Sequence, residues 1–397
     1  MKDYGRLWDY DLTSKVLTKR TIPEEVIKKY LGGRGLASYL MLENAVPNVD
    51  PLSPENIIMF VSGPLTGTPA PGAGKYLVVT KSPATGGWLE SYASGALSVE
   101  MRYAGCDVLL IRGKADTPSI LSITDGKVEL LDGKDLWGVD TYETERILKE
   151  RYTNQRLGIA CIGPAGENLI NFALINSDIF RQAGRGGAGA VMGSKNLKAV
   201  IASGTKGIAC ADKAKLLAHL ASNVQEAQAD VRVENRRKFG TSSTMLNTNR
   251  LGMLPTLNYQ KGTSTEAMGK IDADGVKDHV YHTKGCISCI TPCGIMTHSK
   301  GPLGEQYVEG PEYETLSMLG SNVGIYDLGI ISASNIVCDK EGIDTISTGN
   351  TIAFLMECYE KGLIDDDFTG GLKFTFGNEE LFPNIISDIA HRRGVGA

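Results

Sequence analysis

The sequence predicts an α+β fold in which a β-rich domain is followed by a mainly helical domain. In the first half, short apolar runs alternate with glycine clusters, and helical patterns are too few for a regular βαβ succession. After about Ile208, alanine, leucine, lysine and glutamine recur at helical spacing. A chain of 397 residues is also too long for one ordinary hydrophobic core. We therefore place the two domains at 1–208 and 209–397.

The elements of the first domain each have a local signal. Two short strands are expected within 5–20, and Pro23 with the acidic residues after it favours the start of a helix. A second helix is expected over 36–43, and Asp140 can cap a helix over 141–151. Apolar runs bounded by turn residues predict strands at 57–62, 76–80, 107–112, 119–124, 157–162 and 198–203.

The second domain has mainly helical signals. Helical spacing predicts helices over 211–229, 313–322, 328–340 and 348–361. Residues 230–285 are polar with little strand signal. The sequence shows no internal repeat and no low-complexity segment.

Composition excludes several classes of function. A net charge of −5 leaves no electrostatic footprint for nucleic acid. No apolar run reaches the ~18 residues that would span a membrane, and the charged N-terminus lacks the apolar core of a signal peptide. Of the eight cysteines, three are clustered, which favours a reducing compartment and a metal site over a disulfide scaffold. We therefore expect a cytoplasmic protein.

The clustered cysteines, Cys286, Cys289 and Cys293, have the spacing C-x2-C-x3-C. Thiolates at this spacing can surround one corner of a metal centre, and Pro292 with the flanking glycines favours an irregular loop. Three ligands are one short of a full set for a [4Fe–4S] cluster or structural zinc. The spacing favours an iron–sulfur cluster, with zinc and three free thiols as the alternatives. Radical-SAM enzymes use the opposite order. The other five cysteines are interpreted as small buried residues.

A glycine-rich stretch at 181–189 satisfies G-x-G-x-x-G literally, through Gly184, Gly186 and Gly189. As a dinucleotide-binding fingerprint it is weak, because no apolar strand precedes it and no acid ends a second strand. Exposed backbone N–H groups and two arginines instead suit a phosphate or another anion. A tight glycine turn packed on a sheet is the alternative.

Several stretches, taken in order, resemble the tungsten- or molybdenum-dependent aldehyde ferredoxin oxidoreductase family. The resemblance extends over essentially the whole chain. The stretches lie at 32–35, 62–68, 80–83, 162–168, 183–198, 284–294, 309–314 and 339–344, the last with the pattern D-x-x-G-[LI]-D. The resemblance implies a β-rich domain whose glycine loops lie over a tungsten (or molybdenum) bis-pterin cofactor. It further implies a helical domain with a [4Fe–4S] cluster and the remaining pterin contacts.

The resemblance assigns roles to individual residues. Cys286, Cys289 and Cys293 would bind the cluster. Glu314 matches the active-site acid, which could move the proton released as aldehyde and water become acid. A solvated charge on a helix is the alternative for Glu314. The residues expected near the cofactor phosphate are Arg181, Gln182, Gly184 and Arg185.

The motif at 339–344 is expected to hold one pterin through Asp339, Gly342, Ile343 and Asp344. A carboxylate can accept paired hydrogen bonds from the amino and ring N–H groups of a pterin. The alternative is an ordinary helix C-terminus at Gly342, followed by Asp344 as the N-cap of the next helix.

The sequence departs from the family at several positions. Lys75 stands where many members have arginine, which keeps the charge but loses the fork geometry. Residues 91–95 read S-Y-A-S-G where the family has S-N-S-G-G, so Tyr92, Ser94 and Gly95 are the corresponding candidates for cofactor contacts and for a Mg2+ ion. Ala333 replaces the carboxylate that binds iron between subunits in one branch, so no such iron is expected.

The implied activity is oxidation of a small aldehyde to a carboxylic acid, with electrons passed through the cluster to ferredoxin or an electron-transfer subunit. The resemblance is also compatible with a homodimer. The alternatives are a reductase like class II benzoyl-CoA reductase, a sugar-phosphate aldehyde oxidoreductase, and a truncated non-catalytic chain that needs a partner. Because the family continues beyond this chain, with the fourth cluster cysteine in that part, we expect a fragment or a site completed by a separate chain.

Overall fold

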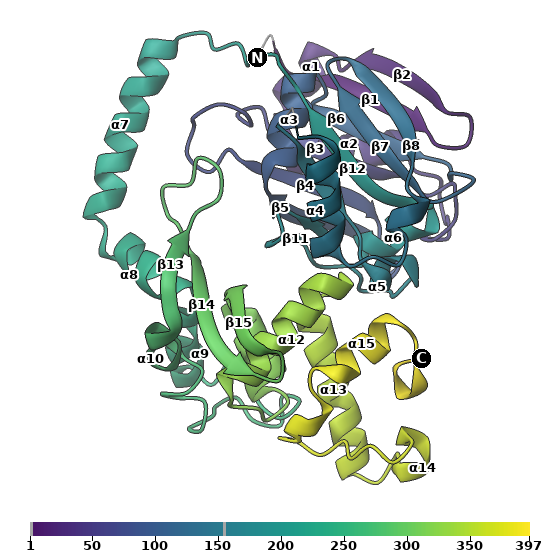
Figure 1. Ribbon diagram of the computed structural model, residues 1–397. Helices are drawn as coiled ribbons and strands as arrows, with labels where there is room; N and C mark the ends of the chain where they lie inside the picture. Colours follow the sequence, from purple (N-terminus) through teal and green to yellow (C-terminus); the bar gives the residue numbers. More distant parts are fainter. Residues whose placement is uncertain (1–2, 154–155) are drawn as a thin grey trace. The chain divides into compact units, whose positions relative to one another are not determined.

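The computed structural model describes residues 3–153 and 156–397. These form two compact units (Figure 1). The first unit comprises Met1–Asn223 with Cys286–Cys289 and Lys340–Ile343, and the second comprises Val224–Gly285, Ile290–Asp339 and Asp344–Ala397. The predicted class, a β-rich region followed by a mainly helical region, is confirmed. The domain boundary near residue 208 stays a prediction.

The first unit contains two six-stranded sheets, with strand orders β2-β1-β6-β3-β4-β5 and β11-β10-β9-β12-β7-β8. The strands of the first sheet are β1 (Arg6–Asp11), β2 (Val16–Thr21), β3 (Ile58–Ser62), β4 (Lys75–Lys81), β5 (Trp88–Ser94) and β6 (Val108–Arg112). Those of the second sheet are β7 (Ser119–Thr124), β8 (Lys127–Asp132), β9 (Gly158–Cys161), β10 (Ile175–Ser177), β11 (Arg181–Ala183) and β12 (Leu197–Ser203).

The two sheets repeat a single topology. Each begins with an antiparallel hairpin, β1–β2 or β7–β8. The first strand of each hairpin then pairs in parallel with the last strand of its sheet, β6 or β12. The remaining neighbours pair antiparallel. The repeat lies in strand order and pairing rather than in recurring residues, so a sequence without an internal repeat gave no sign of it.

Helices occupy corresponding places in the two repeats. They are α1 (Glu24–Tyr30), α2 (Gly33–Asn44) and α3 (Ala96–Ala104) in the first, and η1 (Lys134–Leu136), α4 (Thr141–Arg151), α5 (Pro164–Glu167) and α6 (Ala188–Ser194) in the second. Both α3 and α6 lie between the fifth and sixth strands of their repeats. The predicted cap of α4 is confirmed, since Asp140 accepts a hydrogen bond from the Glu143 backbone N–H at 2.9 Å.

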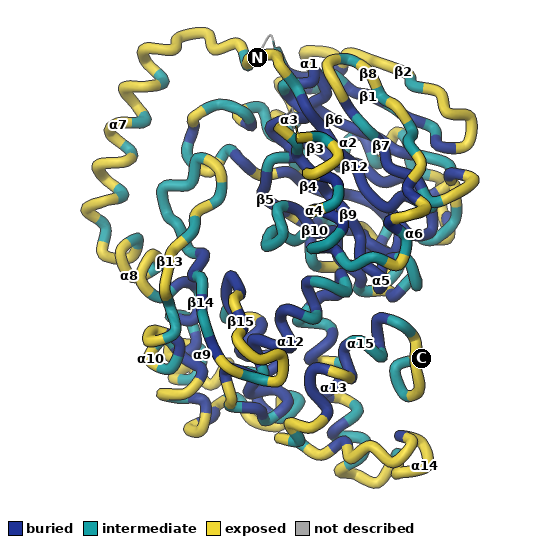
Figure 2. Tube along the Cα trace, viewed as in Figure 1, coloured by how far each residue is buried: buried dark blue, intermediate teal, exposed yellow. Residues whose placement is uncertain are grey.

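Alternating side chains of the strands divide the core into layers. Phe60 of β3 and Val200 of β12 lie in one shared cluster, so the two sheets pack against each other. The neighbouring residue Met59 points instead into a second cluster, with Leu36 and the rest of α2. Ile201 points into a third cluster, beneath α4. Figure 2 shows these central strands as the most buried part of the unit.

The second unit is mainly helical. α7 (Lys213–Ala229) leads into it and has no buried residue (Figure 2). The helices that follow are α8 (Val231–Phe239), η2 (Gly240–Thr244), α9 (Met245–Arg250), α10 (Ala273–Val276), η3 (Lys277–His279), α11 (Tyr313–Leu316), η4 (Ser317–Ser321), α12 (Leu328–Glu341), α13 (Thr345–Glu360), α14 (Asp366–Thr369), η5 (Glu379–Leu381), α15 (Asn384–Ala390) and η6 (Gly394–Gly396). Among the described residues, no helix has both the length and the apolar character needed to cross a membrane.

One expectation for this unit needs correction. A strand was not expected within 230–285, but β13 (Val280–Lys284) forms an antiparallel sheet with β14 (Gly294–Gly301) and β15 (Gly304–Glu309). The strand forms because β14 supplies a partner, which the polar local sequence does not indicate. The helix expected over 313–322 is one α-helical turn, α11, followed by the π-helix η4.

Candidate cofactor site

The repeated topology places a glycine at the same point in each repeat, just before the helix that follows the fifth strand. Gly95 is the N-cap of α3 with φ +118°, and Gly187 is the N-cap of α6 with φ +87°. A Cβ atom on Gly95 would lie 3.0 Å from Asp178 Oδ2, and one on Gly187 would lie 2.0 Å from the Asn171 carbonyl oxygen. Both positions therefore require glycine, for conformation and for space.

Each repeat also fixes the glycine segment of the other. The Asp178 carboxylate, from the β10–β11 turn, accepts a hydrogen bond from the Ala96 N–H at 2.9 Å. Ser82, from the β4–β5 turn, donates its hydroxyl to the Gly186 carbonyl at 2.7 Å. Between them, the buried Tyr76 hydroxyl is 2.6 Å from Ser177 Oγ. The two glycine segments are thus held by reciprocal contacts between the repeats.

The β10–β11 turn is strained, because Asp178 and Ile179 both have positive φ, at +46° and +65°. The buried Glu145 carboxylate holds this turn by accepting hydrogen bonds from the Ile179 N–H at 2.8 Å and the Asn176 amide at 3.1 Å. Lys149 Nζ pairs with the same carboxylate at 3.0 Å. Burial raises the pKa of Glu145. Strain of this kind persists where surrounding contacts over-determine the conformation.

The predicted cofactor residues of the first repeat lie on β4 and β5. Lys75 begins β4, is exposed, and stands opposite Ser94 in the strand register. Ser94 is buried and donates its hydroxyl to the Gly74 carbonyl at 3.0 Å. Tyr92 is 46% exposed, so its ring is accessible from solvent. The cofactor and Mg2+ roles of these residues stay predictions.

The predicted phosphate contacts of the second repeat lie on and after β11. Arg181 donates to the Phe180 carbonyl at 2.7 Å, and Gln182 donates to Asn176 Oδ1 at 3.3 Å. Arg185 is exposed, and its backbone N–H donates to Ser91 Oγ on β5 at 3.3 Å. The structure thus brings the stretch 91–95 to the stretch 181–185. β11 pairs antiparallel with β10, unlike the parallel strand of a dinucleotide-binding βαβ unit.

The centre of the predicted pterin motif, Lys340–Ile343, belongs to the first unit. Gly342 has φ +73°, and its carbonyl accepts the Leu174 N–H at 2.8 Å. Ile343 is buried and forms a β-bridge with Ala173. A Cβ atom on Gly163 would lie 2.4 Å from the Glu341 carbonyl oxygen. The backbone of the G-P-A-G stretch at 163–166 therefore packs directly against the backbone of the D-x-x-G-I-D motif.

The two carboxylates of this motif are buried and already partnered. Asp339 accepts a hydrogen bond from the Asn335 amide at 2.8 Å. Asp344 caps α13 by accepting from the Ile346 and Ser347 N–H groups at 3.2 and 3.0 Å. The capping geometry that was the alternative for Asp344 is therefore present. Because a carboxylate offers about four acceptor positions, pterin binding is compatible with it and stays a prediction.

The cysteine loop contributes Cys286–Cys289 to the first unit and Cys293 to the second. All three are half-buried, and none of them forms a disulfide. The Cys289 N–H donates to the Cys286 carbonyl at 3.0 Å, which closes the C-x2-C segment into a turn. Within the described part of the chain, no three or more His, Cys, Asp or Glu side chains are grouped closely enough to hold a metal ion. The cluster ligands stay a prediction.

The remaining cysteines correct one expectation. Cys106, Cys161 and Cys338 are buried, as predicted, and burial raises the thiol pKa of Cys106 and Cys161. Cys210, however, is exposed, and Cys358 is only half-buried. The prediction of a buried residue was wrong for Cys210, because it lies in a stretch outside any strand or helix, just before α7.

The predicted active-site acid, Glu314, lies on the single turn α11 and is exposed. Its neighbour Tyr313 is anchored, since the Tyr313 N–H donates to Thr241 Oγ1 at 2.8 Å. The π-helix η4 begins three residues after Glu314, and π-helical turns occur frequently at functional sites. The catalytic role of Glu314 stays a prediction.

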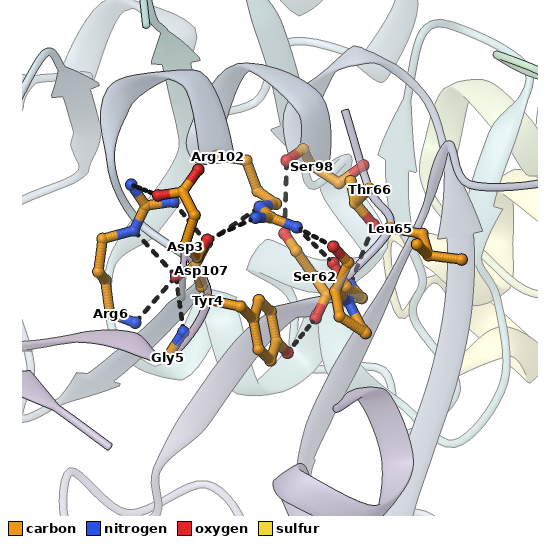
Figure 3. Close-up of polar contacts among 12 residues, drawn as sticks. Asp3, Tyr4, Gly5, Arg6, Ser62, Leu65, Thr66, Ser98, Arg102 and Asp107 are labelled. Atoms are coloured by element: carbon orange, nitrogen blue, oxygen red, sulfur yellow. Dashed lines mark hydrogen bonds and ion pairs between the residues drawn. The ribbon is translucent and has the colours of Figure 1, made fainter. Parts of the chain in front are cut away.

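A buried ion network that the sequence did not reveal holds the 62–68 stretch (Figure 3). Arg102 Nε pairs with Asp107 at 3.0 Å, and both side chains are almost fully buried. The Arg102 guanidinium also donates to the Gly63 and Pro64 carbonyls at 2.9 and 2.7 Å. Asp107 in turn accepts from Arg6. A lone Arg-x4-Asp pattern gives no sequence signal, so only the fold shows this anchor.

A buried lysine in the 183–198 stretch predicts a specific pH dependence. Lys195 donates to the Pro54 and Gly113 carbonyls at 3.1 and 3.0 Å, and burial lowers its pKa to about 8. Between that value and the ordinary pKa near 10.5, the unfolded chain binds more protons, so folding stability rises with pH. The free energy of unfolding of the wild type should therefore rise by roughly 2–3 kcal/mol more than that of Lys195→Met between pH 7 and pH 10. Denaturant unfolding at each pH, followed by tryptophan fluorescence, measures this free energy. If the stability of the two proteins changed with pH in the same way, the prediction would be contradicted.

Comparison with known proteins defines the class first. Residues 8–204 match the family model "Aldehyde ferredoxin oxidoreductase, N-terminal domain", and residues 218–397 match "Aldehyde ferredoxin oxidoreductase, domains 2 & 3". The chain therefore belongs to the aldehyde ferredoxin oxidoreductase family. It is 41% identical to the tungsten-containing aldehyde ferredoxin oxidoreductases of Pyrococcus abyssi, over 397 residues, and of Pyrococcus furiosus, over 396 residues.

The matches cover the chain more fully than they cover the relatives. Each of these two alignments includes 99% of this chain but 65% of the relative's length. A solved structure, the active site complex BamBC of benzoyl coenzyme A reductase with 1,5-dienoyl-CoA, aligns with a TM-score of 0.83 and 28% identity. That alignment covers 99% of this chain and 61% of the other.

Proposed function

We propose that the chain is the cofactor-binding part of an oxidoreductase that converts an aldehyde to a carboxylic acid. The cofactors would be a tungsten (or molybdenum) bis-pterin centre and a [4Fe–4S] cluster. The observation that carries the proposal is the duplication of the first unit. Gly95 and Gly187 occupy equivalent places in its two repeats, and the stretches 91–95 and 181–185 of the same unit, which hold several expected cofactor contacts, lie next to each other. A cofactor made of two pterins suits a site built twice.

The residues present fit such a cofactor in their chemistry. Gly95, Gly187 and Gly163 lie where a Cβ atom would clash with a neighbouring oxygen, so the close packing of these segments requires glycine. Arg181 and Arg185 supply positive charge for phosphate. Asp339 and Asp344 supply buried carboxylate acceptors for pterin N–H groups. Lys75 and Tyr92 would lie at the exposed edge, where Mg2+ and the link to the cluster are expected.

The bound metal would supply a Lewis-acidic centre that takes up two electrons as aldehyde and water become carboxylic acid and two protons. The task of the protein side chains is proton transfer. Glu314 is exposed on a short helical turn, so its carboxylate can exchange protons with solvent. The electrons would leave through the cluster held by Cys286, Cys289 and Cys293 to ferredoxin or an electron-transfer subunit.

A reductase of the benzoyl-CoA type is the second candidate, and the TM-score of 0.83 to the BamBC complex favours keeping it. The sequence identities favour the first candidate, because the chain is 41% identical to an aldehyde ferredoxin oxidoreductase and 28% identical to the BamBC structure. Substrate class separates the two. Dye reduction driven by simple aldehydes supports the first candidate, whereas turnover only with an acyl-CoA thioester supports the second.

The test is metal analysis with EPR on the 397-residue chain, purified and reconstituted without oxygen. We expect about one tungsten or molybdenum and about four irons per chain, with the signal of a reduced [4Fe–4S] cluster. Iron without tungsten or molybdenum would support the cluster and contradict pterin binding by this chain. Zinc in place of iron would overturn the cluster assignment.

A further inference from the structure

We propose that residues 63–75 form a preformed seat for the Cys286–Cys289 turn, and that Gly74 and Ser288 are positioning residues for the iron–sulfur cluster. The seat lies entirely within the first unit. The inference rests on the proposed function for the identity of the cluster. Gly74 and Ser288 would hold the two ligands Cys286 and Cys289 in place, and the local geometry restricts which residue types can stand at these two positions.

The turn itself has an unusual conformation. Ser288, which lies between the two cysteines, has φ +56°. Few residues other than glycine adopt this left-handed region, and asparagine, aspartate and histidine are the commonest exceptions. The hydrogen bond from the Cys289 N–H to the Cys286 carbonyl, at 3.0 Å, closes the turn around it. A serine in this conformation needs contacts from outside the turn to hold it there.

The seat supplies those contacts. The Gly72 N–H donates to the Ser288 carbonyl at 2.8 Å, and Ser288 Oγ donates to the Thr68 carbonyl at 3.5 Å. At Gly74, an added Cβ atom would lie 2.6 Å from Ile287 Cβ and 2.7 Å from the Ile287 carbonyl oxygen. Two backbones therefore touch at this point, and no other residue type fits at position 74 without moving the turn.

The seat is itself fixed at both ends. Upstream, Arg102 donates to the Gly63 and Pro64 carbonyls (Figure 3), and the Tyr103 hydroxyl donates to the Gly67 carbonyl at 2.9 Å. Downstream, Ser94 donates to the Gly74 carbonyl at 3.0 Å, directly before β4. The seat is therefore anchored without any contact to metal. Ligands supported in this way are positioned before the metal binds, which favours binding and retention.

The experiment compares two disruptive variants with two matched controls, in the whole reconstituted chain. Gly74→Ala places a methyl group against Ile287, and Ser288→Val places a β-branched residue at positive φ. Gly207→Ala is the same glycine substitution in open space at ordinary φ, and Ser288→Asn keeps a residue that tolerates positive φ. Circular dichroism verifies that each variant is folded.

Two measurements are made. Loss of iron to a chelator should be at least about tenfold faster in Gly74→Ala and Ser288→Val than in the wild type, with both controls within about twofold. In the metal-free chain, alkylation of Cys286 and Cys289, relative to the exposed Cys210, should be several-fold faster in the disruptive variants.

The outcomes separate this inference from the proposed function. A wild type that binds no iron contradicts the proposed function, and the alkylation rates then decide the inference alone. A wild type that binds iron, with Gly74→Ala and Ser288→Val equal to it in iron release, overturns the inference. Equally fast loss of iron in Gly207→Ala and Gly74→Ala would also overturn the inference, because the effect would not depend on contact with Ile287.

Discussion

Replacing Arg102 with methionine should lower the free energy of unfolding by about 3–5 kcal/mol, because it removes one of the two arginines that pair with the buried Asp107 carboxylate and leaves partly buried carbonyl groups without their donor. Asp107 is fully buried, and its pair with Arg102 is 3.0 Å long. The substitution also removes the donors to the Gly63 and Pro64 carbonyls. Methionine keeps most of the side-chain volume, so the loss reports charge and hydrogen bonding more than a cavity.

Tryptophan fluorescence during urea unfolding measures this loss. Trp8, Trp88 and Trp137 all lie in the first unit, so the signal reports that unit. The matched control is Arg146→Met, which removes an exposed arginine paired with Glu143 and Glu150 on the surface of α4. Exposed pairs of this kind contribute little to stability, so Arg146→Met should unfold at nearly the same urea concentration as the wild type. Equal losses in the two variants would show that the Arg102 network does not anchor the 62–68 stretch.

Replacing Cys289 with alanine should abolish the cluster. If three cysteines of this chain bind [4Fe–4S], removing one leaves too few thiolates to retain it. Iron content should fall to background, and the reduced-cluster EPR signal should disappear. Cys210→Ala is the control, because Cys210 is an exposed thiol of the same unit with no assigned role. Full iron retention in Cys289→Ala would remove this residue from the ligand set.

The same variant distinguishes the alternatives for the cysteine loop. A zinc site would lose zinc rather than iron in Cys289→Ala. Three free thiols would leave the metal content of the wild type at background from the start. A fall in tungsten or molybdenum along with iron would indicate that the cluster and the pterin centre depend on each other for stable binding.

Local sequence patterns predicted many elements of the first unit because each has a local cause. The cap at Asp140 precedes α4 as expected, and the apolar runs at 57–62 and 198–203 became β3 and β12. The patterns did not predict α3. Seven of its nine residues are buried, and the buried Ser98, Glu100 and Arg102 alternate with apolar residues instead of marking an exposed helical face. β13 was missed because its pairing depends on β14.

The candidate site divides in a similar way. By itself, the sequence determined the thiol spacing, the glycine stretches, the D-x-x-G-I-D motif and, through their order, the family. Only the tertiary structure decided that the strand order repeats, that Asp178 and Ser82 each hold the glycine segment of the other repeat, and that Gly74 touches Ile287. The physical reason is that these contacts join residues far apart in the chain, and strand order, which no local pattern encodes, brings them together.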